Sequence, residues 1–342
     1  MTEEREEIVK PVKKIILLIF VLLTAISAQN YQISESVKRS ALRINDYLIN
    51  CEFDNAYKLS DSLLLKNPKE PLYYYLALAS IGLKSLDFDE ILDSEKFREI
   101  YERGITIVNA MLEKEPDNCD LQMIRGFLMS SNAAFLLLSR RFAAGVREGT
   151  RALDVLRTAQ LCDPKNYDIG YYLGFFDYAQ AELRRRLGPL AIFTSLTRNA
   201  EDGIRALEAS VKNARFMNYA AKMVLVDVYV RENRLDKTAE ILPALLKKYP
   251  ESRFLLWTKM RYQFARRDTV SAMKTAVAAS RLYLRDGAHH NAVMVLEEAR
   301  KSAGVRRFPP EIREKVEEIA EKIDRERIPS STQRTLNSLL RQ

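Results

Sequence analysis

Residues 226–250 read VDVYVRENRLDKTAEILPALLKKYP, and this stretch is the most informative one about secondary structure. Apolar side chains recur at helical spacing on both sides of the polar segment RENR, which predicts two successive amphipathic helices. Pro250 ends the second helix, because proline cannot continue a helix and restricts the residue before it. The stretch therefore predicts one helix, a turn, and a second helix that stops at Pro250.

The same features recur along the chain. Prolines at positions 68, 116, 164 and 250 each follow an apolar stretch of helical period. EGTRALD at 148–154 and DGIRALE at 202–208 carry the same kinds of residue in the same order, which indicates internal duplication. Only 11 Gly and 11 Pro occur in 342 residues, and no stretch sustains the two-residue alternation of a strand. We therefore predict an all-α repeat protein.

These spacings resemble the tetratricopeptide repeat (TPR), whose units of about 34 residues form two antiparallel helices. In 226–250, Tyr229 stands at the family's tyrosine position, Leu242 and Leu245 at its apolar positions and Pro250 at its closing proline, whereas the small Ala239 is displaced by one residue. Weaker matches are Tyr47, Ala56, Leu63 and Pro68 in an early unit, Leu173-Gly174 in a middle one, and Ala272, Ala276 and Ala279 in a late one.

The resemblance implies a right-handed α-α superhelix of antiparallel helix pairs over 29–286. Three units, beginning near Leu72, Cys119 and Tyr167, exceed the family's length by roughly 14 to 20 residues, which predicts longer helices or inserted loops. Helices at 289–302 and 311–327 are expected to cap the array within 287–330, because repeat arrays need a polar end. We expect 331–342 to be a loose tail.

The N-terminus has the pattern of an export signal. An apolar run at 15–26 follows Lys13 and Lys14 and precedes the small residues Ser27 and Ala28. The run is shorter than the roughly 20 residues that span a bilayer, which favours a cleaved signal peptide at 1–28, with an inner-membrane signal anchor as the alternative. Since no N-x-S/T sequon occurs, we expect a bacterial protein that is periplasmic or associated with the outer membrane.

Several function classes lose support from the composition. Cys51, Cys119 and Cys162 are far apart without a CxxC pair, so we expect buried free thiols rather than a disulfide or a metal site. The only histidines are the adjacent His289 and His290, and no nucleotide, metalloprotease or serine-hydrolase motif occurs. We expect no enzyme activity, no cofactor and no metal. The net charge of +8 is spread among interleaved acidic residues, which argues against a nucleic-acid partner.

The TPR resemblance implies a protein or peptide partner, bound in the concave groove that the first helices of the units line. Aromatic, Met and Arg side chains contribute most energy in protein interfaces, although the same residues can be packed in the core, and that alternative stays open. The family's carboxylate clamp is not matched, because Tyr171 and Phe175 stand where its Lys and Asn would be. The groove candidates are Tyr75, Met123, Phe127, Tyr171, Phe175, Tyr178, Met223, Asp227, Arg231, Trp257, Arg261 and Phe264.

The segment RRRLGPLAIFTSLT at 184–197 is a second candidate contact. Arginines beside an apolar run suit a lipid headgroup boundary or an anionic partner, whereas the alternative is a short helix folded back on the array. The candidate contacts are Arg184, Arg185, Arg186, Ile192 and Phe193. The sequence thus predicts a non-enzymatic scaffold or adaptor of the cell envelope, with a membrane-contacting protein or a solute- or glycan-binding protein as alternatives.

Overall fold

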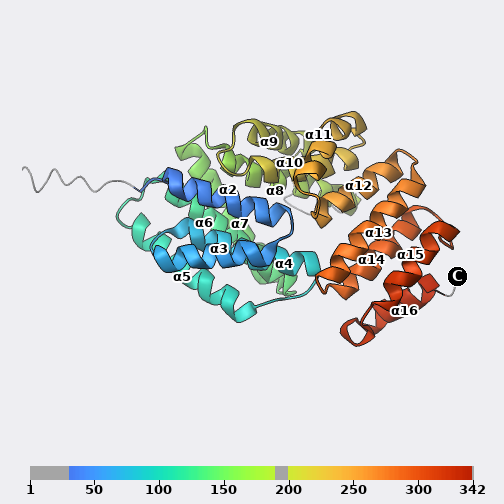
Figure 1. Cartoon of the computed structure of the whole chain (residues 1–342). Coiled ribbons are helices and arrows are strands. Elements are labelled where there is room, and N and C mark those ends of the chain that lie inside the picture. The colour runs from blue at the N-terminus through green and yellow to red at the C-terminus, as the bar shows by residue number, and fades with distance from the viewer. Residues whose placement is uncertain (1–30, 189–198, 341–342) are drawn as a thin grey trace, which may run out of the picture.

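A computed structural model describes residues 31–188 and 199–340, and the regular elements of these residues are all helices (Figure 1). Apart from α8 and α9, successive helices are joined by short turns, and from α2 to α14 each helix packs against the next, which confirms the predicted all-α array of antiparallel pairs. The helices are α2 (Glu35–Ile49), α3 (Phe53–Lys66), α4 (Pro71–Phe88), α5 (Ser94–Leu112), α6 (Cys119–Leu138), α7 (Phe142–Cys162), α8 (Tyr167–Leu187), α9 (Ala200–Asn213), α10 (Asn218–Arg231), α11 (Leu235–Lys248), α12 (Arg253–Ala265), α13 (Thr269–Arg285), α14 (His289–Ser302), α15 (Pro310–Glu321), the 3₁₀ turn η2 (Arg325–Arg327) and α16 (Ser330–Leu340).

Local sequence explains where the helices begin and end. The side chains of Ser34, Asn118 and Ser252 accept hydrogen bonds from backbone amides three residues ahead and cap α2, α6 and α12. The prolines at 68, 116, 164 and 250 follow the last residues of α3, α5, α7 and α11 within four positions. The extra length of the middle units lies largely in the helices, since α4 to α8 have 18 to 21 residues and α10 to α12 have 13 or 14.

The duplicated motif lies where two helices approach closely. Gly203, from the DGIRALE copy, faces Gly174 of the Leu-Gly pair across the α8–α9 contact. A Cβ added at Gly174 would lie 2.9 Å from the carbonyl oxygen of Gly203, and one added at Gly203 would lie 2.7 Å from that of Gly174. Both positions therefore require glycine, because any side chain would push the helices apart.

One described helix, α6, is long and apolar enough to cross a membrane. More than half of its apolar window is buried inside the protein, including Leu121, Ile124, Phe127 and Leu128. Its hydrophobicity is therefore explained by its place in the core, between α4, α5 and α7.

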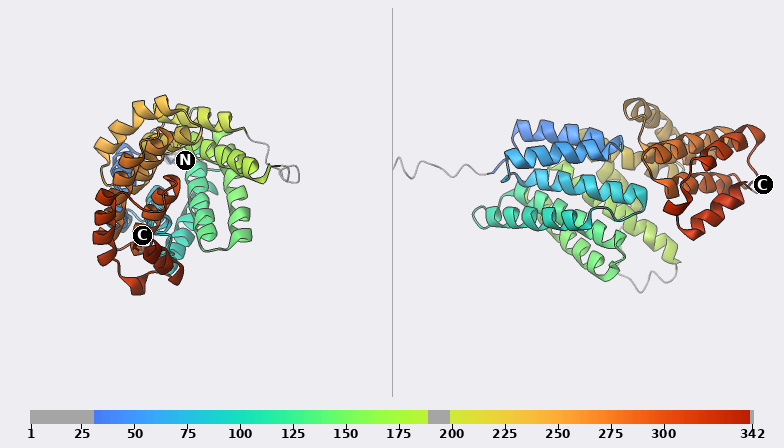
Figure 2. Two further views of the ribbon diagram at one scale, coloured as in Figure 1. Left: turned by 90° about the vertical axis from the view of Figure 1, so that its right-hand side faces the viewer. Right: turned by 60° about the horizontal axis from the view of Figure 1, so that its bottom comes forward.

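The superhelix closes on itself, and seen along its axis the helices form a ring (Figure 2). The first closing contact joins α2 to the segments around α10 and α11. The amide of Asn45 donates to the carbonyl oxygen of Phe216 at 2.9 Å, and Asp46 accepts hydrogen bonds from Lys248 at 2.9 Å and from the Tyr249 hydroxyl. Residues about 170 to 200 positions apart in sequence are thus joined.

A second closing contact joins α4 to α12 and α13. Arg253 is buried, its Nε lies 2.7 Å from a carboxylate oxygen of Asp87, and it also pairs with Asp286. The Tyr283 hydroxyl donates to the other oxygen of Asp87 at 3.2 Å. Burial raises the pKa of Asp87 although the charge of Arg253 opposes that shift. This cluster fixes the later units against the first ones.

Two expectations about the chain are wrong. A loose tail was expected at 331–342, but residues 331–340 belong to α16, which extends to Leu340 and buries Thr332, Leu336 and Leu339; residues 341 and 342 lie outside the described residues. The apolar face of α16 packs on α14, whose first helical residue, His289, and last, Ser302, are those predicted.

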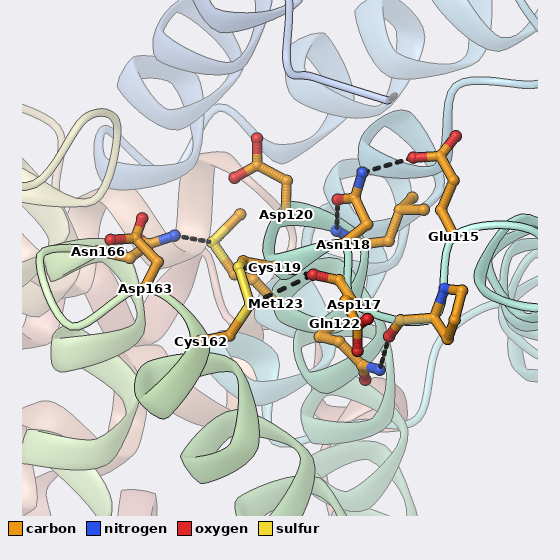
Figure 3. Close-up of a disulfide and its surroundings, with 12 residues drawn as sticks. Glu115, Asp117, Asn118, Cys119, Asp120, Gln122, Met123, Cys162, Asp163 and Asn166 are labelled. Atoms are coloured by element: carbon orange, nitrogen blue, oxygen red, sulfur yellow. Dashed lines mark hydrogen bonds between the residues drawn. A yellow bond between two sulfur atoms is a disulfide. The ribbon is translucent and has the colours of Figure 1, made fainter. Parts of the chain in front are cut away.

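The expectation of three buried thiols is also wrong, because Cys119 and Cys162 form a disulfide (Figure 3). Cys119 begins α6 and Cys162 ends α7, and antiparallel packing of these helices brings their Cα atoms to 5.6 Å. Their 43-residue separation in sequence hides this proximity. Cys51 remains a free, partly exposed thiol.

Candidate partner-binding site

The concave side of the early units is filled by its own side chains. Tyr75, Met123 and Phe127 are buried, and the Phe127 ring lies 5.2 Å from that of Tyr75 and 4.4 Å from that of Tyr172. The hydroxyls of Tyr75 and Tyr172 are 2.8 Å apart. Tyr171 packs beside this cluster, and burial raises its pKa to about 12. Because the superhelix closes, these groove candidates form an aromatic core and present little surface to a partner.

Four other groove candidates meet at an open hollow of about 400 Å³ between α8, α10 and α12. They are Phe175 and Tyr178 from α8, and Asp227 and Arg231 from α10. Phe175 is 44% exposed, although it is a large apolar side chain. The other lining residues are Ala179, Glu182, Leu183, Arg186, Val224, Val228 and Phe254.

One carboxylate at this hollow is shared by two arginines. The Nε of Arg231 lies 2.6 Å from Asp227 Oδ2, and the Nη1 of Arg261 lies 2.9 Å from Asp227 Oδ1, which also accepts from the Thr258 hydroxyl at 3.2 Å. Burial lowers the pKa of Arg231, but the hydrogen bond and charge of Asp227 outweigh it and the net pKa is raised. Each guanidinium has five N–H donors, more than this carboxylate can use. Asp227 therefore leaves N–H donors of both guanidinium groups available to a further acceptor.

The groove candidates on α12 are Trp257, Arg261 and Phe264. The guanidinium of Arg261 lies over the Trp257 ring at 5.4 Å, and Trp257 donates through Nε1 to the Tyr283 hydroxyl at 3.1 Å. Phe264 is partly buried against the core of the C-terminal helices. Trp257 thus orients Arg261 and connects the hollow to the buried cluster around Tyr283.

The three arginines at the end of α8 are exposed and unequally paired. Arg185 bonds Glu182 at 3.3 Å and Glu232 at 2.7 Å, and Arg186 bonds Glu182 at 3.1 Å. Arg184 makes no ion pair within the described residues. The other two candidates of this segment, Ile192 and Phe193, lie outside the described residues.

Sequence reasoning missed Leu183, Val224 and Phe254, which supply much of the apolar lining. Helical spacing could have found the first two, because Leu183 lies two turns after Phe175 and Val224 lies one turn before Asp227. Phe254 comes from α12, and its place here depends on how α12 packs against α10.

The hollow is equipped for binding. Its groups are aromatic and aliphatic side chains with arginines and carboxylates already engaged in ion pairs. Within residues 31–188 and 199–340, no group of three His, Cys, Asp or Glu side chains is placed to hold a metal ion. The arrangement suits recognition of an apolar side chain with a nearby negative charge.

Comparisons with known proteins do not assign a function to this chain. No family model matches the chain, and no curated protein matches it. Among solved structures, the chain is similar to that of the human IFIT1 dimer with PPP-AAAA, at 14% sequence identity and a TM-score of 0.42, over 84% of this chain and 68% of that one. At that level the similarity says nothing about what this protein binds.

Proposed function

We propose that this protein is a non-enzymatic scaffold that holds a partner protein segment at the hollow between α8, α10 and α12. The observation that carries the proposal is the exposed Phe175 beside an Asp227 carboxylate shared by Arg231 and Arg261. An aromatic or aliphatic side chain of the partner fills the hollow, and a neighbouring carboxylate of the partner binds the arginines.

The energetics favour such a segment over a flat contact. Burying one large apolar side chain contributes about 1.5–3 kcal/mol. Arg231 and Arg261 are each more than one-third exposed, so they can still bind an incoming carboxylate. Asp227 holds both side chains in place before binding, which reduces the entropy lost on association.

We further propose that the protein works outside the cytoplasm, at the bacterial cell envelope. Two observations support this location: the apolar run at 15–26 and the Cys119–Cys162 disulfide. Disulfides persist mainly in oxidising compartments such as the periplasm. A signal anchor remains the alternative to a cleaved signal.

Selection from a random phage-displayed peptide library tests the binding proposal. The bait is the chain from Gln29, which keeps every described residue. We expect enriched peptides to combine an aromatic or aliphatic residue with Asp or Glu nearby. Their affinity, measured by calorimetry, should fall at least about tenfold in the variant Phe175→Ser/Leu183→Ser, since the two lost apolar contacts together contribute about 1.5 kcal/mol or more.

A matched control replaces two exposed leucines elsewhere, Leu65→Ser/Leu161→Ser. These side chains are more exposed than Phe175 and Leu183, so their loss should leave peptide binding unchanged. Circular dichroism must show equal helicity for all three proteins. If the enriched peptides bind the Phe175→Ser/Leu183→Ser variant as tightly as the wild type, the proposal is wrong.

A further inference from the structure

A second surface lies at the turn between α6 and α7 and shares no residue with the hollow. Phe142 and Val146 lie one helical turn apart on α7, and each is 63% exposed. Leu137 from α6 is also exposed beside this turn. Three large apolar side chains thus stand in solvent where the chain reverses, and we call them, with Arg140, Arg141 and Arg147, the α6–α7 tip.

The arginines of the α6–α7 tip have no ion-pair partner among the described residues. Arg140, Arg141 and Arg147 are exposed, and within the described part of the chain none of them forms an ion pair. Glu148, the neighbouring acidic residue, instead accepts a hydrogen bond from the Tyr101 hydroxyl at 2.7 Å. The tip therefore combines three unpaired cations with exposed apolar side chains.

The end of α8 adds positive charge on the same side of the array. Phe127 of α6 stacks on Tyr172 of α8, which places the two parallel helices in register. The C-terminal ends of α6 and α8 then lie at the same end of the ring, as the views in Figure 2 agree. The exposed Arg184 consequently lies on the side of the molecule that carries the tip.

We propose that the α6–α7 tip binds an anionic phospholipid surface. Apolar side chains that protrude from a convex turn can enter the boundary between headgroups and acyl chains, while flanking arginines keep their charges at the phosphates. Each arginine near an anionic membrane surface adds attraction, and none of the three must first break an ion pair within the described part of the chain. This surface is separate from the hollow, so the scaffold would bind its partner while held at a membrane.

Co-sedimentation with vesicles tests the proposal. The chain from Gln29 is mixed with phosphatidylcholine vesicles that either contain or lack phosphatidylglycerol. We expect binding only to the anionic vesicles, and weaker binding when the salt is raised from about 0.1 M, because screening shortens the Debye length. Arg140→Gln/Arg141→Gln/Arg147→Gln should lower the partition coefficient on the order of 100-fold, from the attraction lost with three arginines.

Two further variants separate the apolar contribution from general effects of charge and exposure. Phe142→Ser/Val146→Ser should lower partitioning at least about tenfold. Lys165→Gln/Arg306→Gln/Arg307→Gln removes the same charge from exposed positions elsewhere and should have a much smaller effect.

The outcomes discriminate clearly. If the wild-type protein binds neither type of vesicle, the lipid proposal is overturned, and the unpaired arginines then indicate an acidic protein partner. Equal losses in the tip variant and the charge-matched control would also overturn it, because binding would then depend on net charge alone. The hollow variant Phe175→Ser/Leu183→Ser should retain full vesicle binding, so failure of one proposal leaves the other testable.

Discussion

Replacing Asp168 should strongly destabilise the folded protein. Asp168 is fully buried near the start of α8 and serves the turn that precedes α10. Its Oδ1 accepts from the backbone amides of Phe216 at 3.0 Å and Met217 at 2.9 Å. Its Oδ2 accepts from the amide of Arg215 at 3.2 Å and from the Nε of Arg215 at 3.1 Å.

The magnitude follows from these four bonds. Hydrogen bonds to a charged group contribute about 1.5–3 kcal/mol each, and a buried donor without a partner costs about 1–3 kcal/mol. The two hydrogen bonds to Oδ1 contribute most of the loss, because their donors are buried. The partly exposed Arg215 would still have its ion pair with Asp120 at 2.9 Å. Asp168→Ala should therefore lower the free energy of unfolding by about 3–5 kcal/mol.

Two comparison variants sharpen the test. In Asp168→Asn the remaining carbonyl oxygen can keep both bonds of Oδ1, so we expect about half the loss of the alanine variant. Asp120→Ala removes one partly exposed ion pair with Arg215 and a long hydrogen bond of 3.5 Å from the backbone amide of Ile33, and should cost less than about 1.5 kcal/mol.

Urea unfolding, followed by circular dichroism and by the fluorescence of Trp257, the only tryptophan, measures these losses. A loss below about 1 kcal/mol for Asp168→Ala would refute the reasoning. So would an equal loss for the alanine and asparagine variants, because the two oxygens would then not act separately.

Two further predictions concern the closing contact at Arg253 and the disulfide between α6 and α7. Arg253→Met should lower the free energy of unfolding by about 3–5 kcal/mol, because it leaves the carboxylate of Asp87 buried and without its arginine. If the unpaired charge causes this loss, adding Asp87→Asn to the Arg253→Met variant should recover part of it. The double variant Cys119→Ser/Cys162→Ser should have a free energy of unfolding about 2–4 kcal/mol lower than the wild type, because the disulfide closes a loop of 43 residues in the unfolded chain. Dithiothreitol should lower the free energy of unfolding of the wild type by a similar amount and leave that of the double variant unchanged.

Local patterns predicted the elements well. Proline positions and apolar periodicity located the helix pairs, and the Leu173-Gly174 match marked a close helix contact that Gly203 completes. Such features depend on residues within a few turns of one another, so they can be read from sequence. The candidate site was predicted only in part, because the side chain of Phe127 belongs to the core and that of Phe175 to the surface although both occupy groove positions of the family pattern.

Local sequence patterns specify an all-α array of paired helices, because helical period, helix caps and helix-ending prolines act over a few residues. Closure of the array is a property of the folded protein, because it depends on pairs such as Asn45 with Phe216 and Asp87 with Arg253, which are separated by more than half of the described array. Closure converts the early groove into core, and an open hollow lies beside Asp227. Small differences in the angle between neighbouring pairs accumulate along a superhelix, and no local pattern records their sum.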